Sequence, residues 1–333
     1  MREARFFKKE EETQSVTCLL CPHHCSIKEG GTGICRVRKN IDGTLYSLTY
    51  GKISSLALDP IEKKPLYHFY PGKEILSIGS VGCNFKCPFC QNWQISQVGV
   101  EEFPLRDITP EMLLQIAKRE GSVGISFTYN EPFIWWEFIY DVASLFRREG
   151  LKNVLVTNGY VEEEPLGELL PLIDAMNIDL KSLDEDFYRK YCKAQLSPVL
   201  FTIEASWRAG VHIELTHLVV TGLNDTLEGI RRLVDWVASL SPSIPLHISR
   251  YFPAYRLSHP PTSLSFLEEA FAIAREKLSF VYLGNVWDEK KSSTFCPSCG
   301  NVVVLRQGYA VRVVGLDGSR CRFCGTDLPF VVS

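Results

Sequence analysis

The chain of 333 residues is long enough to bury the core of one barrel-sized domain with small appendages. Its formal net charge of -3 gives no general attraction to nucleic acids or to anionic membranes. No apolar run reaches membrane-spanning length, and the charged start MREARFFKKEEETQ lacks the apolar core of a signal peptide. We therefore expect a cytoplasmic protein that has no membrane partner and for which binding to nucleic acid is disfavoured.

Strand-like and helix-like patterns alternate along the middle of the chain. We expect three parts: a small cysteine-rich module (1–65), a core (66–290) and a cysteine-rich tail (291–333). Within the core, Thr109, Pro110 and Glu111 mark a helix start with a capping hydroxyl, a first-turn proline and an early acid. The strand-like segments are, in order, EILSIGSV, VGISFTY, NVLVTNG, AMNIDL, VHIELTHLVV, PLHISRYF and FVYLGNV. Repeated strand–helix units predict an α/β fold, with parallel strands in a partial or full (β/α) barrel.

The twelve cysteines fall into three groups, and only Cys192 stands alone. Tight spacings of two or three residues between cysteines suit metal binding better than disulfides, because several thiolates must converge on one small centre. The groups are Cys18, Cys21, Cys25 and Cys35; then Cys83, Cys87 and Cys90; and then Cys296, Cys299, Cys321 and Cys324.

The central group follows directly after the first predicted core strand. Barrel enzymes place their chemistry on such loops, at the carboxyl ends of strands. Three thiolates on a four-iron cubane leave one iron free for another ligand, as catalytic metal sites keep one position open. The alternative is a structural zinc loop that lacks one ligand or borrows Cys192.

The text around this group, GCNFKCPFCQN, resembles the cluster motif of the radical S-adenosylmethionine (SAM) superfamily, in its pyruvate formate-lyase-activating enzyme branch. The whole chain resembles the radical SAM enzyme of the AmmeMemoRadiSam system, through CLLCPHHC, GICRVR, DPIEKKPLYHFYPG, TYNEP, CPSCG and CRFCG. The resemblance implies a [4Fe-4S] cluster on Cys83, Cys87 and Cys90 that binds SAM and cleaves it to methionine and a 5′-deoxyadenosyl radical. It also implies an electron donor such as flavodoxin or ferredoxin, and as partners AMMECR1-like and MEMO-like proteins or a protein substrate.

The resemblance places SAM at the carboxyl ends of successive strands. Glu131 corresponds to the acid of a family Gly-Gly-Glu motif whose glycines are missing here, and Lys181 is suited to neutralise the methionine carboxylate. Strand alternation places Glu214 and Thr216 on one face, which we expect to point inward. The predicted cofactor-binding residues are Phe89, Asn130, Glu131, Thr157, Asn158, Asp179, Lys181, Glu214, Thr216 and His247. For the acidic and basic strand ends the alternative is a solvated turn or charge pair, and no catalytic residue is assigned.

The two outer cysteine groups each offer four thiolates. Cys296, Cys299, Cys321 and Cys324 have the spacing of a zinc ribbon, with an auxiliary cluster as the alternative. Cys18, Cys21, Cys25 and Cys35 suit zinc and an auxiliary iron–sulfur cluster equally, and His23 or His24 could replace a thiolate.

These patterns predict an oxidoreductase-type radical enzyme that abstracts hydrogen from a protein or a small molecule. A glycyl radical protein is one target class, since the resemblance is to activating enzymes. The alternative is a zinc-ribbon scaffold or binding protein, which would not need an open iron. No residue pattern names the substrate.

Overall fold

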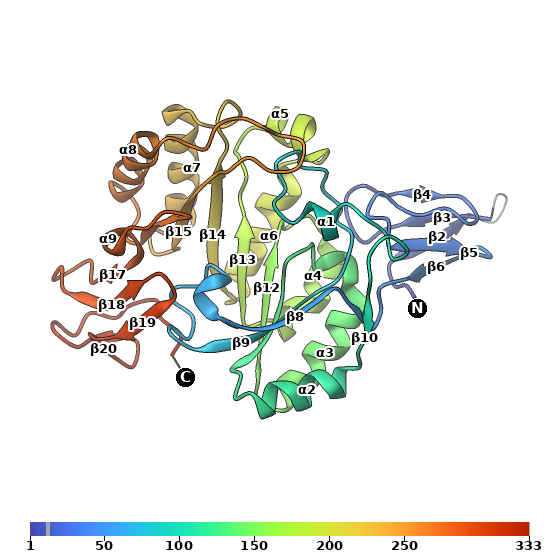
Figure 1. Ribbon diagram of the computed structural model, residues 1–333, viewed down its shortest axis with the longest axis horizontal. Helices are drawn as coiled ribbons and strands as arrows, with labels where there is room; N and C mark the ends of the chain where they lie inside the picture. Colours follow the sequence, from blue (N-terminus) through green and yellow to red (C-terminus); the bar gives the residue numbers. More distant parts are fainter. Residues whose placement is uncertain (11–13, 333) are drawn as a thin grey trace.

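A computed structural model describes residues 1–10 and 14–332. Its centre is an eight-stranded sheet with the order β16-β15-β14-β13-β12-β11-β9-β8 (Figure 1). The strands are β8 (Ser55–Pro60), β9 (Glu74–Gly79), β11 (Gly124–Phe127), β12 (Lys152–Thr157), β13 (Ala175–Asp179), β14 (His212–Val219), β15 (Leu246–Arg250) and β16 (Val281–Gly284). Neighbours from β9 to β16 pair in parallel, whereas β8 pairs antiparallel with β9. Over the described residues β16 and β8 are the two edges, so the prediction of a partial barrel is confirmed.

Helices connect these strands and cover the sheet. The α-helices are α1 (Trp93–Ser96), α2 (Pro110–Arg119), α3 (Trp136–Arg148), α4 (Glu163–Leu169), α5 (Glu185–Phe187), α6 (Ser197–Arg208), α7 (Leu227–Leu240), α8 (Leu264–Arg275) and α9 (Glu289–Ser292). Shorter turns are η1 (Ile61–Lys63), η2 (Phe133–Trp135), η3 (Leu170–Leu172) and the π-helical η4 (Tyr188–Cys192). Helix α3 packs on β11 and β12, α6 on β14, and α8 on β15 and β16.

Side-chain caps fix where several helices begin. The Thr109 hydroxyl accepts a hydrogen bond from the backbone N–H of Met112, which confirms the predicted start of α2. Thr226 and Ser263 cap α7 and α8 in the same way. Each of these strand–helix units therefore starts at a position that its own sequence specifies.

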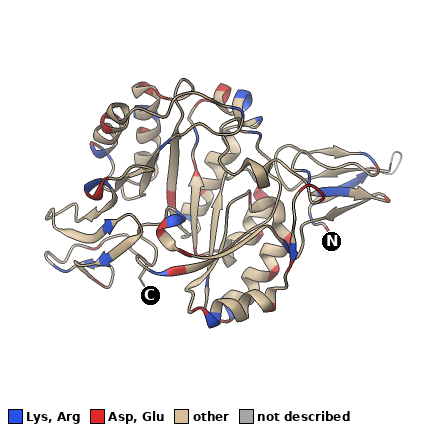
Figure 2. Ribbon diagram, in the orientation of Figure 1, with Lys and Arg blue, Asp and Glu red and all other residues tan. Residues whose placement is uncertain are grey.

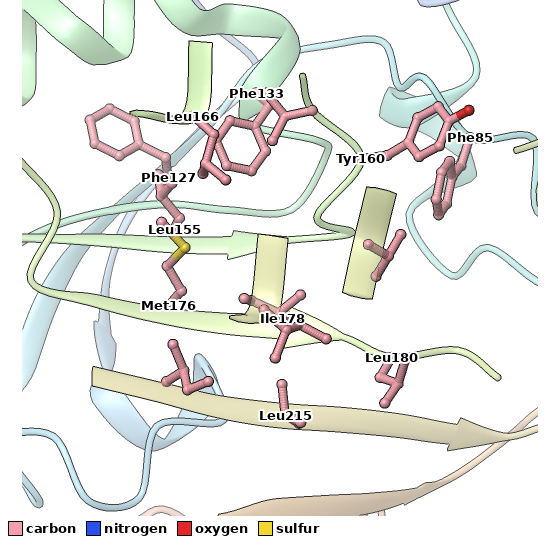
Figure 3. Close-up of a cluster of buried hydrophobic side chains, with 14 of the residues drawn as sticks. Phe85, Phe127, Phe133, Leu155, Tyr160, Leu166, Met176, Ile178, Leu180 and Leu215 are labelled. Atoms are coloured by element: carbon pink, nitrogen blue, oxygen red, sulfur yellow. The ribbon is translucent and has the colours of Figure 1, made fainter. Parts of the chain in front are cut away.

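The hydrophobic core lies between the sheet and its helices. Figure 3 shows Leu155, Met176, Ile178 and Leu215 on neighbouring strands, and all four are fully buried. Strands that are apolar on both faces belong in a covered parallel sheet, which explains why these segments read as continuous apolar runs. This rigid core fixes the positions of the strand ends, where the polar residues follow.

The N-terminal module consists of small antiparallel sheets with the orders β1-β6-β5 and β2-β3-β4. Its strands are β1 (Arg2–Glu3), β2 (Phe7–Glu10), β3 (Ser15–Cys18), β4 (Ser26–Ile27), β5 (Arg38–Ile41) and β6 (Thr44–Ser47). After it, β7 (Lys52–Ile53) pairs with β10 (Arg106–Asp107). Although β8 falls within the range expected for this module, it pairs with β9 in the central sheet; the domain limits themselves stay a prediction.

The C-terminal tail lies at the other end of the molecule from the N-terminal module (Figure 1). It contains β17 (Thr294–Phe295), β18 (Val302–Gln307), β19 (Ala310–Val313), β20 (Leu316–Asp317) and β21 (Arg320–Cys321). The chain then returns to the core, where Val331 forms a parallel bridge with Phe69 and the ring of Phe330 stacks on His68 at 4.1 Å. The tail is thus packed into the core through its last residues.

Charged residues of both signs are interspersed over the outer helices and the two modules (Figure 2). In the part of the chain that the structure describes, no helix has the length and apolar character needed to cross a membrane.

Candidate functional site

The three central cysteines lie on the loop that leaves the carboxyl end of β9. Gly82 has a φ of +85°, and a Cβ there would lie 2.5 Å from the carbonyl oxygen of Cys35, so only glycine fits. The Asn130 side chain holds the same stretch of backbone: it accepts a hydrogen bond from the Ser80 N–H (3.0 Å) and donates to the Gly82 oxygen (3.1 Å). The predicted residue Asn130 therefore shapes the cysteine loop directly.

Cys87 is buried, whereas Cys83 and Cys90 are half-buried. Burial raises the pKa of Cys83 and Cys90, and for Cys87 a contact with the Cys192 thiol at 3.7 Å is the larger cause. The Cys90 sulfur lies 3.1 Å from the Ser96 hydroxyl, which can donate a hydrogen bond to a thiolate. Thiols with raised pKa values bind metal only by releasing their protons to the medium, so metal binding here is coupled to pH.

The spacing of the sulfurs distinguishes the central group from the tail. Among the described residues, only Cys296, Cys299, Cys321 and Cys324 have all their sulfurs within 4.8 Å of one another. The sulfurs of Cys83, Cys87 and Cys90 are spread more widely. In a cubane each thiolate binds a different iron, so this wider spread fits a cluster better than one ion.

Glu131 lies behind the cysteine loop, at the end of β11. Its carboxylate accepts hydrogen bonds from the Thr157 hydroxyl (2.6 Å), the Asn158 N–H (2.8 Å) and the Phe133 N–H (2.9 Å). Burial raises the pKa of Glu131 to about 7, although these donors favour the ionised form. The structure thus brings Glu131, Thr157 and Asn158 together, with Glu131 holding the loop after β12.

A chain of amides links this loop to the cysteines. The Asn158 side-chain N–H group donates to the Asn84 side-chain oxygen at 2.9 Å and lies 3.8 Å from the Cys83 sulfur. Asn84 in turn donates to the Tyr160 carbonyl at 2.8 Å. The neighbouring Phe85 ring packs on the Tyr160 ring at 5.3 Å, as Figure 3 shows. The cysteine loop is therefore anchored to the core by both polar and aromatic contacts.

Lys181 and Asp179 form a pair at the end of β13, near Cys87. The Lys181 ammonium lies 2.9 Å from an Asp179 carboxylate oxygen. Burial opposes the charge of Lys181, but Asp179 and the thiols of Cys87 and Cys192 together raise its pKa well above the ordinary value. Lys181 is thus a permanent cation beside the cysteine loop. Phe89 is buried between Cys87 and Cys90 in sequence, with its ring 6.1 Å from that of Phe187.

Thr216 and Glu214 share a face of β14, as alternation predicts, but they lie at different depths. Thr216 is level with Asp179, and its hydroxyl donates to Asn177 at 2.9 Å. Glu214 is two residues earlier, about 7 Å farther from the strand end. Its carboxylate contacts His247 (2.7 Å) and His212 (3.1 Å).

Histidine contacts dominate the environment of Glu214. Burial opposes its ionisation, but hydrogen bonds from His212 and His247 hold the pKa of Glu214 well below the usual range. The backbone N–H of His68 also donates to Glu214 at 2.7 Å. Glu214 and His247 are therefore brought to each other, not to the cysteine loop, and their role in binding a cofactor stays a prediction.

Asn84 and Ser96 were not singled out from the sequence, and Cys192 was considered only as a ligand that a structural zinc loop could borrow. Asn84 and Ser96 contact cysteine sulfurs, and Cys192 meets Cys87 from η4, more than a hundred positions away in sequence. Asn84 and Ser96 lie within or near the cysteine motif, so proximity in sequence was an available signal. No local signal places Cys192, because only the fold brings η4 to the loop.

The family model of the radical SAM superfamily matches residues 77–237 of this chain. The match begins in β9 and ends in α7, so it includes the cysteine loop and the strand ends described above. That superfamily uses a [4Fe-4S] cluster and SAM as cofactors, and the three cysteines beside the Lys181 ammonium are of a kind that suits both.

Three proteins illustrate what the chain is similar to. An uncharacterized protein of Methanocaldococcus jannaschii is 45% identical over 337 residues and covers 100% of both chains. The pyruvate formate-lyase-activating enzyme of Clostridium pasteurianum is 25% identical over 164 residues, which are 48% of this chain and 67% of that enzyme. The solved structure of Streptococcus suis SuiB bound to S-adenosylmethionine shares the fold, with a TM-score of 0.50 at 16% identity over 63% of this chain and 52% of SuiB.

Proposed function

We propose that this chain is a radical SAM enzyme that abstracts a hydrogen atom from a protein or small-molecule substrate. The observation that carries the proposal is the loop of Cys83, Cys87 and Cys90 at the carboxyl end of β9. When bound there, a reduced cluster supplies the electron that cleaves SAM to methionine and a 5′-deoxyadenosyl radical.

Other residues of this chain would hold the cluster and bind SAM. The three cysteines ligate the cluster, and Asn130 and Asn84 hold their loop in place. Lys181, which is a cation beside the cysteine loop and pairs with Asp179, is assigned to meet the methionine carboxylate of SAM. Glu131 orients Thr157 and Asn158, which we assign to the same ligand. Cys87 and Phe89, which are the buried residues in this part of the loop, would limit the access of water to the reacting atoms.

The activating-enzyme relatives support a protein target, although they match only part of the chain. On that basis we propose a glycyl-radical-activating type of reaction, with flavodoxin or ferredoxin as the electron donor. The motifs DPIEKKPLYHFYPG and CLLCPHHC further support membership of the AmmeMemoRadiSam type and partners of the AMMECR1-like and MEMO-like kind.

For the tail we propose a structural zinc ion. The Cys296 and Cys324 sulfurs lie 3.6 Å apart, and those of Cys299 and Cys321 lie 3.7 Å apart. Four thiolates at about 2.3 Å from a tetrahedral zinc would be separated by about 3.8 Å, which agrees with both distances. Zinc is redox-inert, so this site would stabilise the tail and take no part in electron transfer.

The test of the main proposal is the triple variant in which Cys83, Cys87 and Cys90 become alanine. It should lose about four irons per chain and all reductive formation of 5′-deoxyadenosine, while its zinc stays constant. The matched control is Cys192→Ala, which removes the nearby thiol that we do not assign as a ligand. Formation of 5′-deoxyadenosine by the reduced triple variant would overturn the proposal. Loss of metal in the control would instead favour a site that includes Cys192.

A further inference from the structure

The four cysteines of the N-terminal module line one shielded pocket, which the proposed function leaves without a role. Cys18, Cys21 and Cys35 are buried, and Cys25 is half-buried. The other residues that line the pocket are Leu20, Ile27, Gly33, Ile34, Arg38 and Ile134. Apart from Arg38 these residues are apolar, so metal held by the thiols would be kept from water.

The spacing of these sulfurs differs from that of the tail cysteines. Both groups offer four thiolates, yet within residues 1–10 and 14–332 only the tail brings three or more sulfurs within 4.8 Å of one another. The four N-terminal cysteines all line the same pocket, but their sulfurs do not form such a tight group. A group of this width fits a cluster whose irons each bind a different thiolate, and not a single zinc ion.

Arg38 is a second, independent indication that this pocket holds an anionic cluster. Its side chain is 1% exposed, and its two Nη atoms bind the Glu137 carboxylate at 3.1 and 2.7 Å. Its Nε is buried and has no hydrogen-bond partner among the described residues, although Arg38 lines the thiol pocket. A buried N–H group without a partner is costly, and an anionic cluster in the pocket would satisfy it. The Ile34 N–H already donates to the Cys25 sulfur at 3.5 Å.

The thiol pocket directly adjoins the loop of the main site. The carbonyl of Cys35 lies against Gly82, where no side chain would fit, and Gly82 precedes Cys83. The His23 ring lies 2.7 Å from the carbonyl oxygen of Asn84, the residue after Cys83. The backbone that carries one set of thiols therefore contacts the backbone that carries the other.

We propose that Cys18, Cys21, Cys25 and Cys35 bind an auxiliary [4Fe-4S] cluster that passes electrons to the cluster of Cys83, Cys87 and Cys90. The relay part rests on the proposed function. A low-potential donor protein transfers one electron to the N-terminal cluster, which is thereby reduced. The N-terminal cluster then transfers this electron to the cluster of Cys83, Cys87 and Cys90 and returns to its oxidised form. No bond forms or breaks in this transfer, and the same electron is then consumed in the cleavage of SAM.

Metal analysis of the anaerobically purified wild-type chain tests the site without any substitution. The proposal expects about eight irons and about one zinc per chain. About four irons and two zincs would overturn it, because the N-terminal thiols would then hold zinc.

Two double variants test the relay. Cys18→Ser/Cys25→Ser should lose about four irons and its own electron paramagnetic resonance (EPR) signal, while Cys299→Ser/Cys324→Ser should lose only zinc. With dithionite as the reductant, the N-terminal variant should form 5′-deoxyadenosine within about twofold of wild type, but with reduced flavodoxin the rate should fall at least about tenfold. An unchanged rate with flavodoxin would overturn the relay.

Failure of the proposed function and failure of the relay would give different EPR results. The EPR signal that SAM perturbs should vanish in the Cys83, Cys87 and Cys90 variant and persist in the N-terminal variant. If neither signal responded to SAM, the main proposal would fail while the N-terminal iron count still stood. Circular dichroism and gel filtration serve to check that each variant is folded.

Discussion

Replacing Arg306 with methionine removes the cation that joins the tail to the core. Arg306 comes from β18 and is fully buried, with its Nε 3.6 Å from the Glu62 carboxylate, whose side chain is 1% exposed. It also donates to the Thr294 hydroxyl at 2.8 Å and to the Tyr67 carbonyl at 2.5 Å. Its guanidinium lies over the Tyr67 ring at 4.2 Å from the centroid.

The expected cost follows from burial. Removing one partner of a buried ion pair leaves the other charge unpaired and typically costs about 3–5 kcal/mol. Arg320 in the same tail provides the control, because it pairs with Asp327 at 2.7 Å while their side chains are 67% and 77% exposed. Such a surface pair contributes about 0–1 kcal/mol, so Arg320→Met should be nearly neutral.

Urea unfolding of the metal-loaded chain, followed by tryptophan fluorescence, measures the difference. Arg306→Met should have a clearly lower midpoint than Arg320→Met, and adding Glu62→Gln should recover part of the loss because the unpaired charge is removed. Equal midpoints for the two single variants would refute the view that Arg306 fastens the tail to the core.

Three further results are expected. Lys181→Met should weaken SAM binding by roughly ten- to a hundredfold with unchanged iron content, since a charge-assisted hydrogen bond is lost. If a binding titration gave the same affinity for the variant and the wild type, the pair of Lys181 with Asp179 would have only a structural role. Burial lowers the pKa of His68 to about 3, so the neutral ring stabilises the fold fully above about pH 6.5, and this stabilisation is lost as the pH falls below that value. Between pH 7 and 5 the unfolding free energy of the wild type should therefore fall by about 2 kcal/mol more than that of His68→Gln. Equal decreases in the two proteins would contradict this. Cys299→Ser/Cys324→Ser should release about one zinc and lower stability at constant iron, whereas a loss of about four irons would show a cluster in the tail.

Much of the fold could be predicted because the sequence patterns that specify it lie within short segments of the chain. Apolar runs specified the parallel strands of the core, and capping residues such as Thr109 specified where helices begin. The edge strand β8 was not predicted, because LALDP is neither a continuous apolar run nor followed by a helix that would complete a unit.

The site was predictable only in part. Spacing indicated the three cysteine groups, and the strand ends pointed to Glu131 and Lys181, whose roles in binding stay a prediction. Alternation gave the shared face of Glu214 and Thr216, but it carries no information on depth along the strand. The histidines that surround Glu214 come from separate segments, so only tertiary packing shows how its carboxylate is occupied. The different spread of sulfurs in the two four-cysteine groups is likewise a property of the folded chain.

The contact between Arg306 and Tyr67 has a consequence for biosynthesis, since the two residues are 239 positions apart in the sequence. On the ribosome, the segment around Tyr67 emerges long before its partners in the tail. Closing so long a loop is slow, and the core strands can assemble first from contacts between consecutive units. Until the tail arrives, Tyr67 and His68 lack their contacts with Arg306 and Phe330, leaving apolar surface for a chaperone to cover. If the tail holds zinc as proposed, the supply of zinc would set the rate of maturation, and a cell starved of zinc should accumulate this chain in chaperone-bound form.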